Sequence, residues 1–333
     1  MAIMVSGGAG FVGLNLVEQL LARGETVVIY GREALPAAAG TAFATLPGRL
    51  TVVQGDVLDR ARLADAFKTH AINRFFPFAA ITAGPQREAD DTETILDVNL
   101  RGMAVQLRCA RDAGVRRIVF PSSISIYGES LNSHGLVRED TTPPVPISIY
   151  GVTKYAGERM ALRLANLWGL DLVCARIGAV IGPWERETGV RDLCGPYMQL
   201  AIAALRGQTV VLPEDILPRS WVYSRDLVAG LILLLDAPKP AHAVYNIASG
   251  INWGPVILAW ARTLESAFPR FRWSQSADPG AVNIRFHDPK PRGIESIERI
   301  AGELAYRPRF LPVAAHADFL VWLKAHGVAY YGA

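Results

Sequence analysis

The sequence has few cysteines, and they are not spaced as metal ligands or disulfide partners. Cys109, Cys174 and Cys194 lie far apart, and no two of them form a Cys-x-x-Cys pair. Disulfide-stapled folds and zinc modules need denser, more regular cysteine spacing, so the sequence argues against both. We predict buried, reduced cysteines and no metal site.

Long apolar runs and a strong charge imbalance are also missing. The longest apolar run, residues 227–235, is about half of the roughly 20 residues that a membrane-spanning helix needs. The 34 Lys and Arg residues nearly balance the 31 Asp and Glu residues, and they do not cluster along one segment. We therefore expect neither a membrane span nor a nucleic-acid partner. A glycine motif begins at Gly7, which leaves no room ahead of it for a signal peptide, so we expect a cytoplasmic protein.

What is present is a globular composition with a regular alternation of elements. The chain has 333 residues, of which 50% are hydrophobic, enough to bury a large core. Short β-branched runs in the first 180 residues alternate with amphipathic stretches of helical period. The runs are residues 3–6, 26–30, 50–54, 74–78, 117–121 and 172–177, and the helical stretches are residues 11–22, 59–68, 94–113 and 150–168. This alternation predicts an α/β fold with a doubly wound parallel sheet of the Rossmann type, whose binding crevice lies at the carboxyl ends of the strands.

The alternation loosens after residue 180. We predict a dinucleotide-binding domain over residues 1–180 and a smaller, mainly substrate-binding lobe over residues 181–333. Segments within about residues 219–249 are expected to return to the main domain. We expect the charged segment 184–192 to be either a lid that recognises the substrate or a solvated loop.

A glycine turn follows the first apolar run and opens the first helical stretch. Gly7, Gly10 and Gly13 permit a tight turn and close backbone approach, so the helix N-terminus can face a pyrophosphate. The second strand ends at Gly31-Arg32, where NAD sites carry an acidic residue and NADP sites often carry an arginine. Because Arg32 is able to grip a 2′-phosphate and no carboxylate stands at position 31, we favour NADP over NAD.

A tyrosine and a lysine lie four residues apart at the start of a helical stretch. Tyr150 and Lys154 then share one helix face, and the lysine ammonium would stabilise a phenolate that exchanges a proton with a substrate hydroxyl. The apolar run 117–121 ends in a serine-rich turn, where we assign Ser123 to hold the substrate oxygen. For Ser122 and Ser125 we expect turn and helix-capping roles.

Together these motifs resemble the extended short-chain dehydrogenase/reductase family, which includes nucleotide-sugar epimerases and dehydratases. The resemblance runs from Ile3 to about Pro308. It covers the glycine turn, Tyr-x-x-x-Lys, the serine turn and the motifs at residues 55–57, 78–80, 99, 181–183, 219–223, 245–248 and 303–308.

The resemblance implies roles for individual residues. Ser123, Tyr150 and Lys154 would be catalytic, and the substrate would be held by Ser123, Arg219 and Arg292. The implied cofactor-binding residues are Gly7, Gly10, Phe11, Val12, Gly13, Arg32, Asp56, Val57, Ala79, Ala80, Asn99 and Gly178. A homodimer built from the helices near residues 99–113 and 150–168 is also implied.

Several positions depart from the family pattern. Gly31 stands where an acidic residue is frequent, Pro77 where histidine is frequent, and Ala179 where nucleotide-sugar enzymes carry a substrate-holding asparagine. Dehydratases carry acidic residues just after the catalytic serine, where this chain has Ile124 and Ser125, so a 4,6-dehydratase is disfavoured.

Three functions follow. The first is an NAD(P)-dependent epimerase acting at a secondary alcohol of a sugar or nucleotide-sugar. The second is an NADP-dependent dehydrogenase or reductase of a free sugar acid or another small hydroxy or keto compound. The third, a catalytically silent NADP-binding regulator, is disfavoured by the intact Ser123, Tyr150 and Lys154 set.

Overall fold

A parallel sheet forms the centre of the computed structural model, which describes residues 1–133, 135–286 and 290–332. Its strands are β1 (Ala2–Ser6), β2 (Thr26–Gly31), β3 (Arg49–Gln54), β4 (Ile72–Pro77), β5 (Arg117–Ser123), β7 (Leu172–Ile177) and β11 (Val244–Ile247). The order across this sheet is β11-β7-β5-β4-β1-β2-β3, and each pairing is parallel. The strand order reverses direction beside β1, which confirms the predicted doubly wound sheet.

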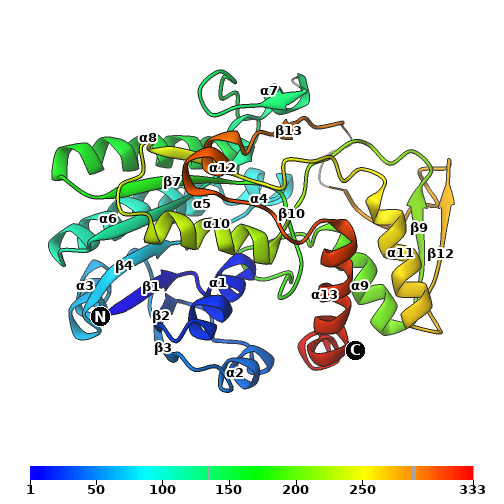
Figure 1. Ribbon diagram of the computed structural model, residues 1–333, viewed down its shortest axis with the longest axis horizontal. Coiled ribbons are helices and arrows are strands. Elements are labelled where there is room, and N and C mark those ends of the chain that lie inside the picture. The colour runs from blue at the N-terminus through cyan, green and yellow to red at the C-terminus, as the bar shows by residue number, and fades with distance from the viewer. Residues whose placement is uncertain (134, 287–289, 333) are drawn as a thin grey trace.

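Helices cover both faces of the sheet, as Figure 1 shows. The side chains of β1 alternate between two hydrophobic cores: Ile3 and Val5 belong to one, and Ala2 and Met4 to the other. The first core includes residues of α1 (Phe11–Ala22) and α10 (Ser224–Asp236). The second includes residues of α3 (Arg60–Thr69), α6 (Gly102–Asp112) and α8 (Ile149–Trp168). Burial on both faces explains why the strands read as continuous apolar runs.

The stretch expected as one helix over residues 94–113 is divided. It consists of α5 (Thr92–Leu96), a π-helical turn η1 (Asp97–Arg101) and α6. Inside that turn the Asn99 amide accepts a hydrogen bond from the backbone N–H of Ile81 at 2.8 Å and donates one to its carbonyl at 3.0 Å. These bonds attach the turn to the segment after β4. Two short helices, α2 (Ala37–Phe43) and α4 (Pro85–Asp90), lie in segments where none was expected.

The C-terminal half adds small parallel strand pairs and further helices. The pairs are β8 (Val180–Ile181) with β10 (Val222–Tyr223), β9 (Thr209–Pro213) with β12 (Arg272–Ser276), and β6 (Leu136–Val137) with β13 (Ile294–Glu295). The helices of this half are α9 (Pro196–Arg206), α11 (Val256–Ala267), α12 (Glu298–Leu304), α13 (Pro312–Trp322), η3 (Leu323–Gly327) and α14 (Val328–Tyr331), while η2 (Ile124–Ile126) and α7 (Glu129–Ser133) follow β5 in the first half. The core on the α1 side of the sheet continues into α9, α11 and α13, so the two halves share packing. Within the described ranges, no helix has the length and apolarity needed to cross a membrane.

Candidate active site

A large cavity opens at the carboxyl ends of the central strands. Its volume is about 1680 Å³, and its walls come from the ends of β1, β2, β4, β5 and β7 and from the C-terminal half. A pocket for one small ligand usually measures roughly 300–1,000 Å³. The cavity is therefore large enough for two extended ligands.

The glycine turn forms one wall of the cavity. Gly7 has a φ of +65°, and a Cβ there would lie 2.8 Å from the backbone nitrogen of Ala79. A Cβ on Gly13 would lie 2.6 Å from the carbonyl oxygen of Gly7. Gly10 is the N-cap of α1 and offers no side-chain cap, so backbone N–H groups of the first turn remain available to an anion. This geometry fits the pyrophosphate of a dinucleotide.

Carboxylates flank the position where a 2′-phosphate would bind. Arg32 lines the cavity after β2, but its guanidinium faces Asp56 at 3.8 Å and its side chain is 57% exposed. Glu33 also lines the cavity and pairs with Arg186 at 3.2 Å. The inference that no carboxylate would oppose a phosphate here was wrong, because it considered position 31 and not these two neighbours.

Ser123, Tyr150 and Lys154 meet at the end of β5. Ser123 is the last residue of that strand, while Tyr150 and Lys154 lie in the first turns of α8, which Ser148 caps by accepting a hydrogen bond from the N–H of Gly151. The Lys154 ammonium lies 5.6 Å from the centre of the Tyr150 ring and donates to the Pro121 carbonyl at 2.9 Å. All three residues line the cavity.

Burial shifts the pKa values of both α8 residues. Burial lowers the pKa of Lys154 from 10.5 to about 8. Burial also raises the pKa of Tyr150 above 10, while hydrogen bonding to Ser123, the Arg191 guanidinium and hydrogen bonding to Thr82 act in the opposite direction. These three neighbours thus offset part of the effect of burial on the pKa of the Tyr150 phenol.

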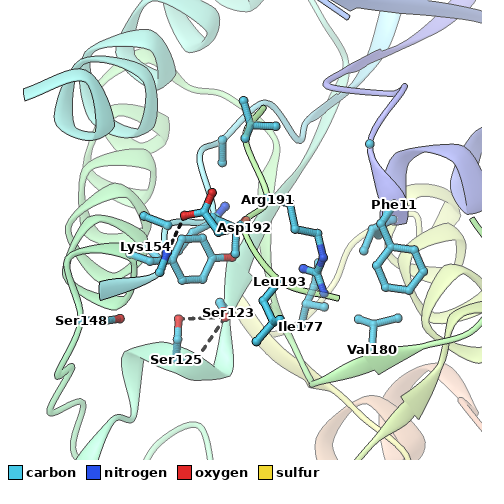
Figure 2. Close-up of a pocket in the computed structure, with 18 of the residues that line it drawn as sticks. Phe11, Ser123, Ser125, Ser148, Lys154, Ile177, Val180, Arg191, Asp192 and Leu193 are labelled. Atoms are coloured by element: carbon cyan, nitrogen blue, oxygen red, sulfur yellow. Dashed lines mark hydrogen bonds between the residues drawn. The ribbon is translucent and has the colours of Figure 1, made fainter. Parts of the chain in front are cut away.

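The serine turn differs in detail from the expectation. Ser123 itself caps η2: its Oγ accepts hydrogen bonds from the Ser125 N–H at 3.1 Å and from the Ser125 hydroxyl at 2.9 Å (Figure 2). The capping role expected for Ser122 was wrong, because its hydroxyl instead donates to Glu158 at 2.6 Å. Glu158 is fully buried and pairs with Arg176 at 2.7 Å, so Ser122 belongs to a polar network beneath the site.

Residues 184–193, here named the strap, run beside the cavity, and residues 188–193 line it. Trp184 and Glu185 are fully buried, which excludes a fully solvated loop. Glu185 pairs with Arg191, whose guanidinium lies 5.5 Å from the centre of the Phe11 ring (Figure 2). Asp192 accepts a hydrogen bond from the Gly84 N–H at 2.8 Å and pairs with Arg87 at 2.5 Å. The strap is thus attached to the segment that follows β4.

The predicted substrate residues lie in the C-terminal part of the cavity. Arg219 is 6% exposed and lines the cavity together with Arg292, Lys290 and Phe286. Ala179, where the resemblance led us to expect an asparagine, also lines the cavity.

The remaining predicted cofactor residues divide into two groups. Those that line the cavity are Phe11, Val12, Val57, Ala79, Ala80 and Gly178. Asn99 does not, since its buried amide is bonded to Ile81 and to Thr153. Sequence reasoning missed Thr82, which lines the cavity beside Tyr150. Its place just after β4, at the carboxyl edge of the sheet, was an available signal.

Comparisons with known proteins agree with this geometry. The NAD dependent epimerase/dehydratase family matches residues 3–248. The UDP-glucose 4-epimerase of Lacticaseibacillus casei is 34% identical over 182 residues, 55% of this chain and 52% of that protein. Sterol demethylase protein B of Methylococcus capsulatus is 34% identical over 187 residues, 56% of this chain and 53% of that protein. These matches thus span about half the length of both curated relatives. Among solved structures, MoeE5 in complex with UDP-glucuronic acid and NAD has a TM-score of 0.77 and 26% identity, covering 98% of this chain and 99% of that one.

Proposed function

Since the chain belongs to the NAD dependent epimerase/dehydratase family, we propose that it is a nicotinamide-dependent epimerase of a nucleotide-linked sugar. The observation that carries this proposal is the convergence of Ser123, Tyr150 and Lys154 in a cavity large enough for a dinucleotide and a second extended ligand. The glycine turn would hold the cofactor pyrophosphate at the N-terminus of α1.

Each of the three residues has a distinct task in this proposal. When bound, the nicotinamide would take up a hydride from a secondary carbinol carbon of the sugar. Tyr150 accepts the hydroxyl proton and later returns it, and Ser123 donates its hydrogen to the substrate oxygen. The nearby Lys154 ammonium favours the phenolate form of Tyr150.

Arg219 and Arg292 would hold the nucleotide part of the substrate. Both line the cavity, and a guanidinium offers bidentate hydrogen bonds to phosphate oxygens. With Ala179 at the position of the family asparagine, the sugar would be held by the serine turn and by the strap.

The choice of cofactor rests on groups around the adenosine ribose. Arg32 favours NADP, as predicted from the sequence, whereas Glu33 and Asp56 favour the uncharged 2′-hydroxyl of NAD. The family description and the MoeE5 complex name NAD and give the NADP preference no support. We propose that NAD serves at least as well, and titration with each dinucleotide tests this.

A net dehydrogenase is the second candidate. The similarity to sterol demethylase protein B favours this second candidate. The name of that relative refers to a sterol, which is an alcohol of a different chemical class from a nucleotide-linked sugar. An apolar substrate would offer no phosphate oxygens to Arg219 and Arg292, which line the cavity. Stoichiometric reduction of added cofactor would identify this activity.

We also propose a homodimer through α8. Val152 and Leu167 on this helix are 44% and 56% exposed, so the helix offers apolar side chains that a second copy could cover. Sedimentation of the purified protein as a monomer at micromolar concentration would contradict the dimer.

Replacement of Tyr150 tests the proposed chemistry. Tyr150→Phe removes the proton-transferring hydroxyl and should lower turnover by about 10²–10⁴-fold while leaving cofactor binding nearly unchanged. The assay follows interconversion of UDP-glucose or UDP-glucuronic acid with their 4-epimers. Tyr155→Phe, a matched change on the same helix, should retain activity. Undiminished turnover in Tyr150→Phe would overturn the mechanism.

A further inference from the structure

An arginine of the strap lies beside the glycine turn. The Arg191 guanidinium is 5.5 Å from the centre of the ring of Phe11, which is the first residue of α1. Both side chains are drawn at the cavity in Figure 2, and both residues line it together with Gly10. The strap therefore brings a positive charge close to the helix N-terminus at which the cofactor pyrophosphate is proposed to bind.

The Arg191 guanidinium has more donors than the protein uses. One of its nitrogens pairs with Glu185, which also accepts a hydrogen bond from the Gly195 N–H at 2.7 Å. No other acceptor from the described residues bonds to this guanidinium, and its Nε is buried without one. The side chain is 24% exposed. Because a guanidinium carries five N–H donors in a planar fork, this one is able to bind a carboxylate and a second anion together.

Backbone bonds hold Arg191 in this place. Its carbonyl accepts a hydrogen bond from the Thr188 N–H at 3.0 Å, and its own N–H donates to the Thr188 hydroxyl at 3.0 Å. Arg191 also pairs with Thr82 as a parallel bridge, which attaches it to the segment after β4. The charge is thus carried on a bonded turn, and a ligand that binds it needs to immobilise less of the chain.

We propose that Arg191 binds the diphosphate of the dinucleotide, beside the backbone N–H groups of the glycine turn, and so fastens the strap to the cofactor. The inference rests on the proposed function in that a dinucleotide occupies the glycine turn. The diphosphate of a nucleotide-linked substrate is the other anion of the cavity, and its proposed partners are Arg219 and Arg292. The short distance from Arg191 to Phe11 favours the cofactor diphosphate.

The ion pair between Glu185 and Arg191 provides variants that separate diphosphate binding from a purely structural role. Arg191→Met leaves the fully buried Glu185 carboxylate without its cation, so the double variant Glu185→Gln/Arg191→Met removes both charges. Glu185→Gln alone keeps the guanidinium and an acceptor for the Gly195 N–H. If Arg191 served only to hold the strap through Glu185, then Glu185→Gln would weaken cofactor binding as much as Arg191→Met does.

The test measures dissociation constants, by fluorescence titration for NADH and by competition for ADP-ribose, which carries the diphosphate, and adenosine, which carries no phosphate. Arg191→Met and the double variant should bind NADH and ADP-ribose roughly ten- to a hundred-fold more weakly, because charge-assisted hydrogen bonds are lost. Their affinity for adenosine and for UDP should not change. Glu185→Gln and the exposed control Arg206→Met should bind all four compounds as wild type does.

Wild-type affinity for ADP-ribose in both Arg191→Met and the double variant would overturn the inference. An equal loss in Glu185→Gln would also overturn it, since Arg191 would then act only as the partner of Glu185. Weaker binding of UDP in place of ADP-ribose would assign the guanidinium to the substrate instead. These titrations need no turnover, so a wild-type protein that binds ADP-ribose through Arg191 but epimerises no sugar would refute the proposed function and leave this inference standing.

Discussion

Lys154 is a buried residue whose charge is costly to desolvate. The residue is 7% exposed, its ammonium donates to the Pro121 carbonyl, and burial lowers its pKa to about 8. Desolvation of a charge destabilises the fold unless partners compensate for it, and such costs are common where a site serves chemistry. The Lys154 pKa therefore yields a prediction about stability as well as turnover.

We predict that Lys154→Met stabilises the protein at pH 7 by about 1–3 kcal/mol while abolishing turnover. Below pH 8 the lysine is charged in both the folded and unfolded states, so the burial cost is fully present. Between about 8 and 10.5 the unfolded chain binds more protons than the folded protein, so wild-type stability rises with pH and the advantage of the variant shrinks. Urea unfolding at several pH values measures this. A variant less stable than wild type at pH 7 would contradict it.

Residue-scale prediction from the sequence found residues that line the cavity where a motif carries both residue type and spacing. Gly7, Gly10, Gly13, Ser123, Tyr150 and Lys154 all line the cavity. It failed at Thr82 and Glu33, because their roles depend on which side chains face them from distant segments. Thr82 meets Tyr150, and Glu33 meets Arg186, only after the chain has folded.

At the scale of elements, the strap forms part of the cavity wall and is attached to other segments at several points. It is attached by Asp192 to Gly84 and Arg87, and by Arg186 to Glu33. Tyr330 on α14 donates to the carbonyl of Trp184 at 3.1 Å and supports its other end. A cofactor on the glycine turn would lie beneath this segment, so strap opening should limit its release.

Asp192→Asn tests the attachment of the strap. The amide keeps an acceptor for Gly84 but loses the ion pair with Arg87, so cofactor dissociation should accelerate by roughly three- to ten-fold. Stopped-flow displacement of a fluorescent reduced cofactor measures the rate. Glu187→Gln is the control, since its pair with Arg285 at 3.5 Å is exposed. Equal rates in wild type and Asp192→Asn would show that the strap does not retain the cofactor.

Sequence periodicity located the long elements but not their interruptions. The stretch 94–113 reads as one helix because its apolar spacing continues through the π turn η1. The sequence did not distinguish a lid from a solvated loop for the strap, because its charges resemble those of a solvent-facing segment. In the structure, Glu185 pairs with Arg191 and Trp184 is buried. A local sequence pattern cannot show which residues pair when they lie far apart in the chain.

At the scale of the whole molecule, the alternation of strands and helices was sufficient to predict the doubly wound sheet. Right-handed crossovers and two-sided burial leave few other arrangements. The C-terminal half was less predictable, because its two-residue strands such as β8 and β10 depend on pairing partners far away in the chain. Arg219 and Arg292 line the cavity from that half, so local sequence patterns did not predict which substrate they would face.

The most direct test of the central claim is mass spectrometry of the small molecules released when the purified protein is denatured. A cavity built to hold a dinucleotide under the strap predicts a nicotinamide dinucleotide retained at close to one per chain, as an epimerase that reuses its cofactor requires. Protein that carries no dinucleotide, and binds neither NAD nor NADP on titration, would contradict the account. Protein that loses its dinucleotide on purification and rebinds it reversibly would point to the net dehydrogenase instead.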